Sequence, residues 1–186
     1  KRTAPLNWFV SSALKNTILI RLIWSGYWKT SGHRPQTMER STGSDMKDIT
    51  LKIVGTQNFD DIEEEQMEFV TDGRFYARGG RAYIIYDESE VSGMEGCKTT
   101  IRVDDRSVRM KRTGLAGFGT ELYFEKGKRF SSIYNTPYGP MGIEVLTDDV
   151  KNELDLEEGR GSVAVQYQVS LEGIAEKKNR ITIDIM

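Results

Sequence analysis

Apolar and polar side chains alternate along most of the chain from Met46 onward. The longest run holds five apolar residues, each separated from the next by one polar or small residue: Val163, Val165, Tyr167, Val169 and Leu171. Successive side chains of a β-strand point to opposite faces, so a period of two predicts a strand with one buried face. This periodicity restricts the chain to folds made of strands.

About nine or ten such runs follow one another, with turn residues between them. Many short strands at this spacing predict an all-β sandwich or closed barrel. Connections of hairpin length favour an up-and-down, antiparallel order of about 8–10 strands. One stretch, 149–158, is expected to form one or two helical turns that end at Gly159. Strand–helix–strand spacing is missing, which excludes a doubly wound nucleotide-binding sheet.

The register of one hairpin, 106–113 with 119–125, follows from its side chains. The pairing that sets Lys111 opposite Glu121 also joins two apolar pairs, Met110 with Leu122 and Val108 with Phe124. Both faces then agree, whereas a slip of one residue would break both. Phe130, in the next predicted strand, is expected to face Phe124.

The first 45 residues differ from the rest. They carry seven Lys/Arg and two acids, a net charge of +5, whereas the remaining 19 bases and 26 acids give −7. All three tryptophans and His33 lie there, and 31–45 reads as a polar linker. Lys15, Asn16 and Arg21 interrupt the apolar stretch, so a membrane-spanning helix is not expected. No clear signal-peptide cleavage site follows it.

We therefore expect 1–45 to be a poorly structured or short-helical extension, a misplaced start or an added leader, outside the core. The barrel domain is expected to span 46–186 and to fold alone. Cys97 is the only cysteine and no N-glycosylation sequon is found, which favours a reducing cytosol. A catalytic thiol needs a nearby base, but His33 lies in the extension, so no enzyme is expected. No metal site is expected, because the acidic runs lack calcium-loop spacing. No other cofactor is expected either.

Three segments carry a family resemblance: 134–139 (YNTPYG), 159–167 (GRGSVAVQY) and 179–185 (NRITIDI). Together with the strand order, they make residues 46–186 resemble the YwiB-like family, a bacterial domain family of unknown function. The resemblance implies a calycin-like barrel related in shape to lipocalins. The family carries no catalytic assignment, so it implies no catalytic residue, and it has no counterpart of 1–45.

A barrel of about eight strands has an interior just wide enough for its side chains or for one small ligand. Both interpretations stay open, with a filled core slightly favoured. The leading functional hypothesis is a cytosolic barrel that binds a small, largely apolar ligand, in an internal cavity above about 300 Å³. The candidate lining residues are aromatic: Tyr86, Phe130, Tyr134, Tyr138 and Tyr167.

The alternative is a protein- or RNA-binding module that uses the basic outer face of strands 106–136. Its candidate residues are Arg109, Lys111 and Arg129, with Tyr123 beside them. They belong to a wider set of bases: Arg102, Arg106, Arg109, Lys111, Arg112, Lys128 and Arg129. Cross-strand ion pairs with Glu121 and Glu125 are favoured over a free basic patch. The net negative barrel domain also argues against binding to nucleic acid.

Overall fold

Ten antiparallel strands form the fold seen in the computed structural model, which describes residues 46–186 except 60–61, 90–95, 115–119, 137–138 and 172–173. The strands are β1 (Lys47–Phe59), β2 (Ile62–Arg78), β3 (Arg81–Asp87), β4 (Lys98–Val103), β5 (Ser107–Thr113), β6 (Thr120–Glu125), β7 (Arg129–Thr136), β8 (Gly139–Asp155), β9 (Arg160–Leu171) and β10 (Ile174–Ile185). The all-β prediction is confirmed. Within the described residues, no helix has the length and apolarity to cross a bilayer. The extension 1–45 lies outside them, so its predicted character and the boundary at Met46 stay predictions.

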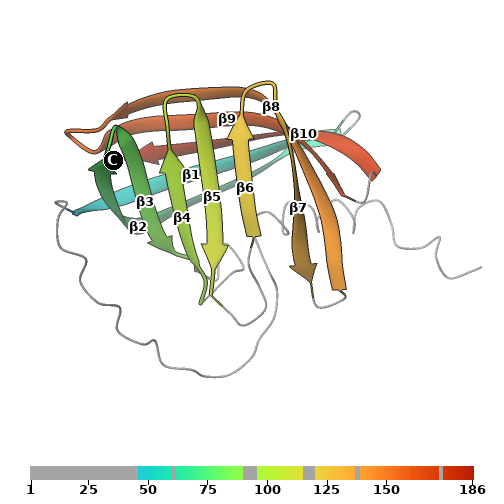
Figure 1. Cartoon of the computed structure of the whole chain (residues 1–186), viewed down its shortest axis with the longest axis horizontal. Coiled ribbons are helices and arrows are strands. Elements are labelled where there is room, and N and C mark those ends of the chain that lie inside the picture. Colours follow the sequence, from blue (N-terminus) through green and yellow to red (C-terminus); the bar gives the residue numbers. More distant parts are fainter. Residues whose placement is uncertain (1–45, 60–61, 90–95, 115–119, 137–138, 172–173) are drawn as a thin grey trace, which may run out of the picture.

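The strands follow an up-and-down order that nearly closes on itself. Chain neighbours pair from β1 to β6 and from β7 to β10, and β1 pairs with β10, with Leu51 opposite Ile185. β6 and β7 are the two ends of the sheet, and Figure 1 shows them diverging from their shared turn. The structure is therefore a barrel with one break in its hydrogen bonding, here called the β6/β7 split.

The turn at the narrow end of the split is held by β8. The amide of Gly127 donates to the carbonyl of Thr147 at 2.8 Å, and the Thr147 amide donates to the carbonyl of Lys128 at 3.1 Å. Gly127 has a φ of 75°, a left-handed conformation that glycine adopts without steric cost. This turn brings β7 onto β8 and leaves β6 on the far side of the split.

The predicted hairpin register is confirmed. Lys111 lies opposite Glu121, with both apolar pairs on the inner face. The predicted helix at 149–158 is wrong: β8 continues to Asp155 and a turn follows. Val150 pairs with Val165 and Leu154 with Gly161 of β9. Residues 150–154 thus form a strand ladder with β9, and Val150 and Leu154 pack partly buried against the core, so these tertiary contacts outweigh the local helical preference.

Among the described residues, the buried hydrophobic core draws on every strand except β7. Across β3 to β6, Ile84, Ile101, Met110 and Leu122 are consecutive partners and form an aliphatic row. Phe124 of β6 meets Tyr167 of β9 across the interior, with ring centroids 5.0 Å apart. This contact joins strands on opposite sides of the split.

Candidate functional site

Two residues beyond the aliphatic row, the interior becomes polar. Tyr86, Thr99, Arg112 and Thr120 are consecutive register partners on β3, β4, β5 and β6, and all four are buried. We call them the inner polar row. They point inward because the two-residue alternation of each strand continues through them. A buried arginine is rare unless it is paired, so its partner defines the site.

That partner is Glu88, which directly follows β3. The Nε of Arg112 donates to Oε1 of Glu88 at 3.0 Å and to the hydroxyl of Thr99 at 3.1 Å. The Thr99 hydroxyl donates to the same Glu88 oxygen. The side chains of Arg112 and Glu88 are 5% and 0% exposed. The other carboxylate oxygen, Oε2, is buried and has no hydrogen-bond partner among the described residues.

Two tyrosine hydroxyls lie near this ion pair. Burial raises the pKa of Tyr86 well above its usual range; the charge of Glu88 adds to this rise, and that of Arg112 opposes it. Burial likewise raises the pKa of Tyr167, against the opposing charge of Arg112. Both hydroxyls therefore stay protonated at neutral pH. Tyr167, from β9, is close enough to Arg112 to respond to its charge.

A second polar row lies on the wall made by β1, β10, β9 and β8. Its members are again consecutive partners: Gln57, Asn179, Tyr167 and Thr147. All are buried. Both amide atoms of Gln57 and the hydroxyl of Thr147 have no hydrogen-bond partner among the described residues. Buried polar groups of native proteins are seldom left unsatisfied, so these atoms are notable.

The predicted lining residues are only partly brought together. Tyr86 and Tyr167 lie inside the barrel, as predicted. Phe130 is half-buried, and its ring is 6.0 Å from that of Tyr123, at the split. The ring contact of Phe124 is made by Tyr167 instead. The side chains of Tyr134 and Tyr138 lie outside the described part of the chain.

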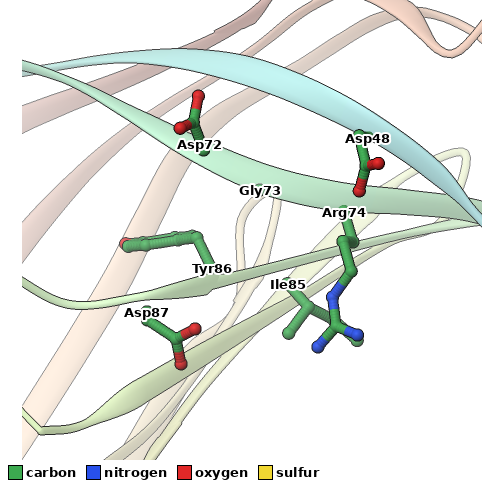
Figure 2. A pocket seen from close by; sticks show the side chains of 7 residues that line it. All are labelled: Asp48, Asp72, Gly73, Arg74, Ile85, Tyr86 and Asp87. Carbon is green, nitrogen blue, oxygen red and sulfur yellow. The ribbon is translucent and has the colours of Figure 1, made fainter.

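A hollow of about 190 Å³ lies between β1, β2 and β3. Its lining is Asp48, Asp72, Gly73, Arg74, Ile85, Tyr86 and Asp87, which Figure 2 shows. The four charged side chains are exposed, so the hollow opens on the outer side of the sheet. It is smaller than the predicted cavity and is not the predicted interior site.

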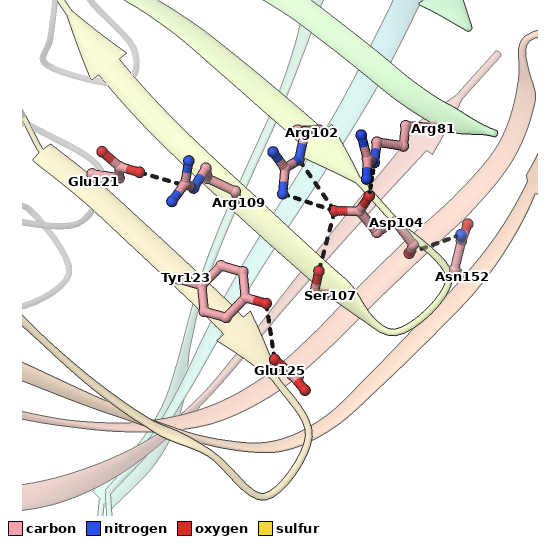
Figure 3. A network of polar contacts seen from close by, with 9 residues as sticks. All are labelled: Arg81, Arg102, Asp104, Ser107, Arg109, Glu121, Tyr123, Glu125 and Asn152. Carbon is pink, nitrogen blue, oxygen red and sulfur yellow. Dashed lines mark hydrogen bonds and ion pairs between the residues drawn. The ribbon is translucent and has the colours of Figure 1, made fainter. Parts of the chain in front are cut away.

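The outer face of β3 to β6 carries the predicted cross-strand ion pairs (Figure 3). Arg109 pairs with Glu121 at 2.9 Å. Asp104, in the β4–β5 turn, accepts hydrogen bonds from Arg81, Arg102 and Ser107. Burial by itself would raise the pKa of Asp104, but these hydrogen bonds and the Arg102 charge lower it on balance. These charged side chains of the outer face therefore bind one another.

The predicted basic patch is largely neutralised. Arg109 is paired with Glu121, and Arg129 with Glu144 at 3.1 Å. Lys111 is exposed and has no ion pair within the described residues. Placing Arg112 among the outer bases is wrong, because it lies inside. The sequence did indicate this position: Arg112 lies two residues after Met110, and the period of two in a strand places both side chains on the same face.

An outer row crosses five strands, and it adds two tyrosines of β2 and β3 to residues that the sequence had indicated for this face. Tyr76, Tyr83, Arg102, Arg109 and Tyr123 are consecutive partners on β2 to β6. The rings of Tyr76 and Tyr83 stack with centroids 4.6 Å apart. The guanidinium of Arg109 lies 6.0 Å from the centre of the Tyr123 ring. This outer row combines aromatic and cationic side chains on an exterior surface.

Cys97 is buried and lies beside Gly114, where an added Cβ would come within 2.6 Å of the Cys97 Cα. The residue thus packs closely against the backbone at Gly114. In the part of the chain that the structure describes, no group of three or more His, Cys, Asp or Glu side chains has a metal-binding arrangement. The charged chemistry of the interior rests on Glu88 and Arg112.

Comparison with known proteins adds a family and a fold. Residues 51–183 match the family described as "Domain of unknown function (DUF1934)". The "Uncharacterized beta-barrel protein YwiB" of Bacillus subtilis (strain 168) is 28% identical over 121 residues, which cover 65% of this chain and 82% of that protein. The crystal structure of the ywiB protein from Bacillus subtilis superposes with a TM-score of 0.58 and 21% identity, over 75% of this chain and 92% of that one. The predicted family resemblance and the barrel are thereby confirmed.

Proposed function

The chain belongs to the DUF1934 family, and from this premise we propose that it is a non-enzymatic, cytosolic barrel that binds a small, largely apolar molecule in its interior. The observation that carries the proposal is the ion pair of Glu88 and Arg112 inside a barrel whose core is mainly apolar. Buried ion pairs seldom stabilise a fold more than apolar residues of similar volume would. A role in ligand binding would explain why a buried ion pair is present in this barrel.

The surroundings of the ion pair fit an amphipathic molecule. The aliphatic row lies two residues from the inner polar row on each of β3 to β6. Small-molecule sites commonly combine apolar walls with a few polar groups that fix orientation. The aliphatic row would contact the body of the ligand, and the inner polar row would hold its polar end. The calycin-like character implied by the resemblance is consistent with this proposal.

Entry through the β6/β7 split completes the proposal. No strand ladder joins β6 to β7, so they can separate without breaking inter-strand hydrogen bonds. Thr120, the last member of the inner polar row, stands on the edge strand β6. Phe130 and Tyr123 face each other at the split, and we propose that their rings separate when the ligand enters.

Native mass spectrometry of protein purified from its own host tests the proposal. We expect an added mass of one small molecule that is released on denaturation. Protein stripped by unfolding and refolding should regain this mass from a host extract. A charge at the split, Phe130→Arg, should slow reloading, whereas Ile133→Arg, at a 63% exposed position of the same strand, should not. Bare polypeptide from the host, together with no melting shift in host extract, would refute the proposal.

The outer row supports a second candidate, an RNA-binding surface. RNA bases stack on aromatic side chains, and phosphates pair with arginine or lysine. The outer row contains both aromatic residues and arginines. The pairing of Arg109 with Glu121 weakens this candidate, because an arginine already neutralised has less to offer a phosphate.

Fluorescence anisotropy with a single-stranded RNA decides on this candidate. Affinity should fall steeply between about 50 and 200 mM salt, because binding to phosphates releases counterions. Lys111→Glu, two residues after Arg109 on the outer face of β5 and so next to the outer row, should weaken binding several-fold, and Lys52→Glu, on β1 away from the row, should not. Equal loss in both variants, or no binding near 50 mM salt, would exclude the outer row.

A further inference from the structure

One carboxylate oxygen of the buried ion pair still lacks a hydrogen bond. Oε1 of Glu88 accepts from Arg112 and Thr99, while Oε2 is buried and has no partner among the described residues. A buried charged acceptor left unsatisfied is costly, so it is a natural place for a donor from another molecule. Any ligand that approaches Oε2 gains most if it carries an O–H or N–H group.

The charges of Glu88 and Arg112 restrict which kind of ligand group can donate to Oε2. Glu88 and Arg112 neutralise each other as a pair. A second anion beside Oε2 would be repelled by Glu88, whereas a cation there would be attracted by Glu88 and would compete with Arg112 for it. An ion of either sign would also lose its hydration in this buried site, and a pair that is already neutral compensates only part of that loss. An uncharged donor avoids this cost, and a hydroxyl group meets the requirement.

The second polar row points to the same chemistry. The Gln57 amide offers an NH2 group as donor and a carbonyl oxygen as acceptor, and the Thr147 hydroxyl can act as either. None of these atoms has a hydrogen-bond partner among the described residues. Tyr167 belongs to this row and responds to the charge of Arg112, which links the two polar rows. These groups are uncharged and suit other hydroxyl groups better than ions.

We propose that the interior site selects an uncharged, hydroxyl-bearing amphipathic molecule whose hydroxyl donates to Oε2 of Glu88. The inference rests on the proposed ligand-binding function and specifies its ligand class. The apolar part of the ligand lies against the aliphatic row, as described above. Carboxylates of the same chain length are repelled by Glu88, and carboxylate and ammonium ions alike lose hydration that the neutral ion pair does not replace.

Four probes with similar apolar chains test the inference on the full chain by titration calorimetry: 1-octanol, its isomer methyl heptyl ether, octanoate and octylammonium. The ether keeps the oxygen acceptor but lacks the donor. We expect 1-octanol to bind at least about tenfold more tightly than each of the others, since a hydrogen bond to a charged group is worth at least that factor.

Two variants test whether Glu88 is the residue that causes the preference for alcohol over ether. Glu88→Gln presents an N–H group beside the remaining oxygen, so the preference of alcohol over ether should fall toward one. Glu121→Gln removes an exposed carboxylate of the outer face and should leave the preference unchanged. If Glu88→Gln does not fold, the order of the four probes on the natural chain still decides.

The outcomes separate the inference from the proposed function. Equal binding of alcohol and ether, or tightest binding of octanoate or octylammonium, overturns the hydroxyl inference and leaves ligand binding intact. Failure of all four probes overturns the inference as well. The mass spectrum of the host-purified protein then decides independently whether the barrel carries any ligand.

Discussion

Arg112→Met is expected to lower the free energy of unfolding by about 3–5 kcal/mol, because it leaves Glu88 as an uncompensated buried charge. The Glu88 side chain is fully buried, so water cannot replace the lost partner without reorganisation of the barrel. Methionine retains the approximate length of the arginine stem, which limits the contribution from lost packing. Urea unfolding of the full chain measures the difference.

Two further variants control this result. Arg109→Met removes an exposed cation two residues earlier on β5, from a pair whose side chains are 46% and 36% exposed. Its cost should stay below about 1 kcal/mol. Combining Arg112→Met with Glu88→Leu removes both charges and should recover most of the loss. A loss below about 1 kcal/mol for Arg112→Met alone would show that the interior is hydrated.

The double variant also separates stability from binding. An apolar pair of similar volume should keep the barrel folded while the hydroxyl selectivity disappears. Retained selectivity for 1-octanol in that folded variant would contradict the role assigned to Glu88. The ion pair would then belong to the fold alone.

Tyr167→Ala is expected to cost about 3–5 kcal/mol, the range for truncating a large buried aromatic side chain. Tyr167 is 1% exposed and its ring packs on Phe124. The contact reaches from β9 to β6, across the interior, where no strand ladder joins the two ends of the sheet. Its loss therefore leaves a cavity and also weakens the closure of the barrel.

Comparison with two other tyrosine variants identifies the cause. Tyr167→Phe keeps the ring and should cost much less, so a loss as large as that of alanine would assign the effect to the hydroxyl. Tyr83→Ala removes a half-buried ring from the outer face and should cost about 1 kcal/mol. Urea unfolding of all three variants, with the slope of each transition compared, gives the measurement.

Much of the fold was determined by the sequence alone. Alternation predicted the strands and their inner faces, and charge together with apolar matching predicted the register of β5 and β6. These features are local, since each depends on neighbours along one strand or across one short turn. Where local preference and burial disagreed, at 149–158, the pairing of β8 with β9 decided for a strand.

The candidate site was determined only by the tertiary structure. Alternation does place Arg112 and Glu88 on inner faces, but it does not say that the two meet across β3, β4 and β5. Nor does it show that Tyr167 reaches Phe124, or that the sheet breaks between β6 and β7. The period of a strand defines which face a side chain occupies; which side chains face each other across a barrel depends on closure, here the pairing of β1 with β10.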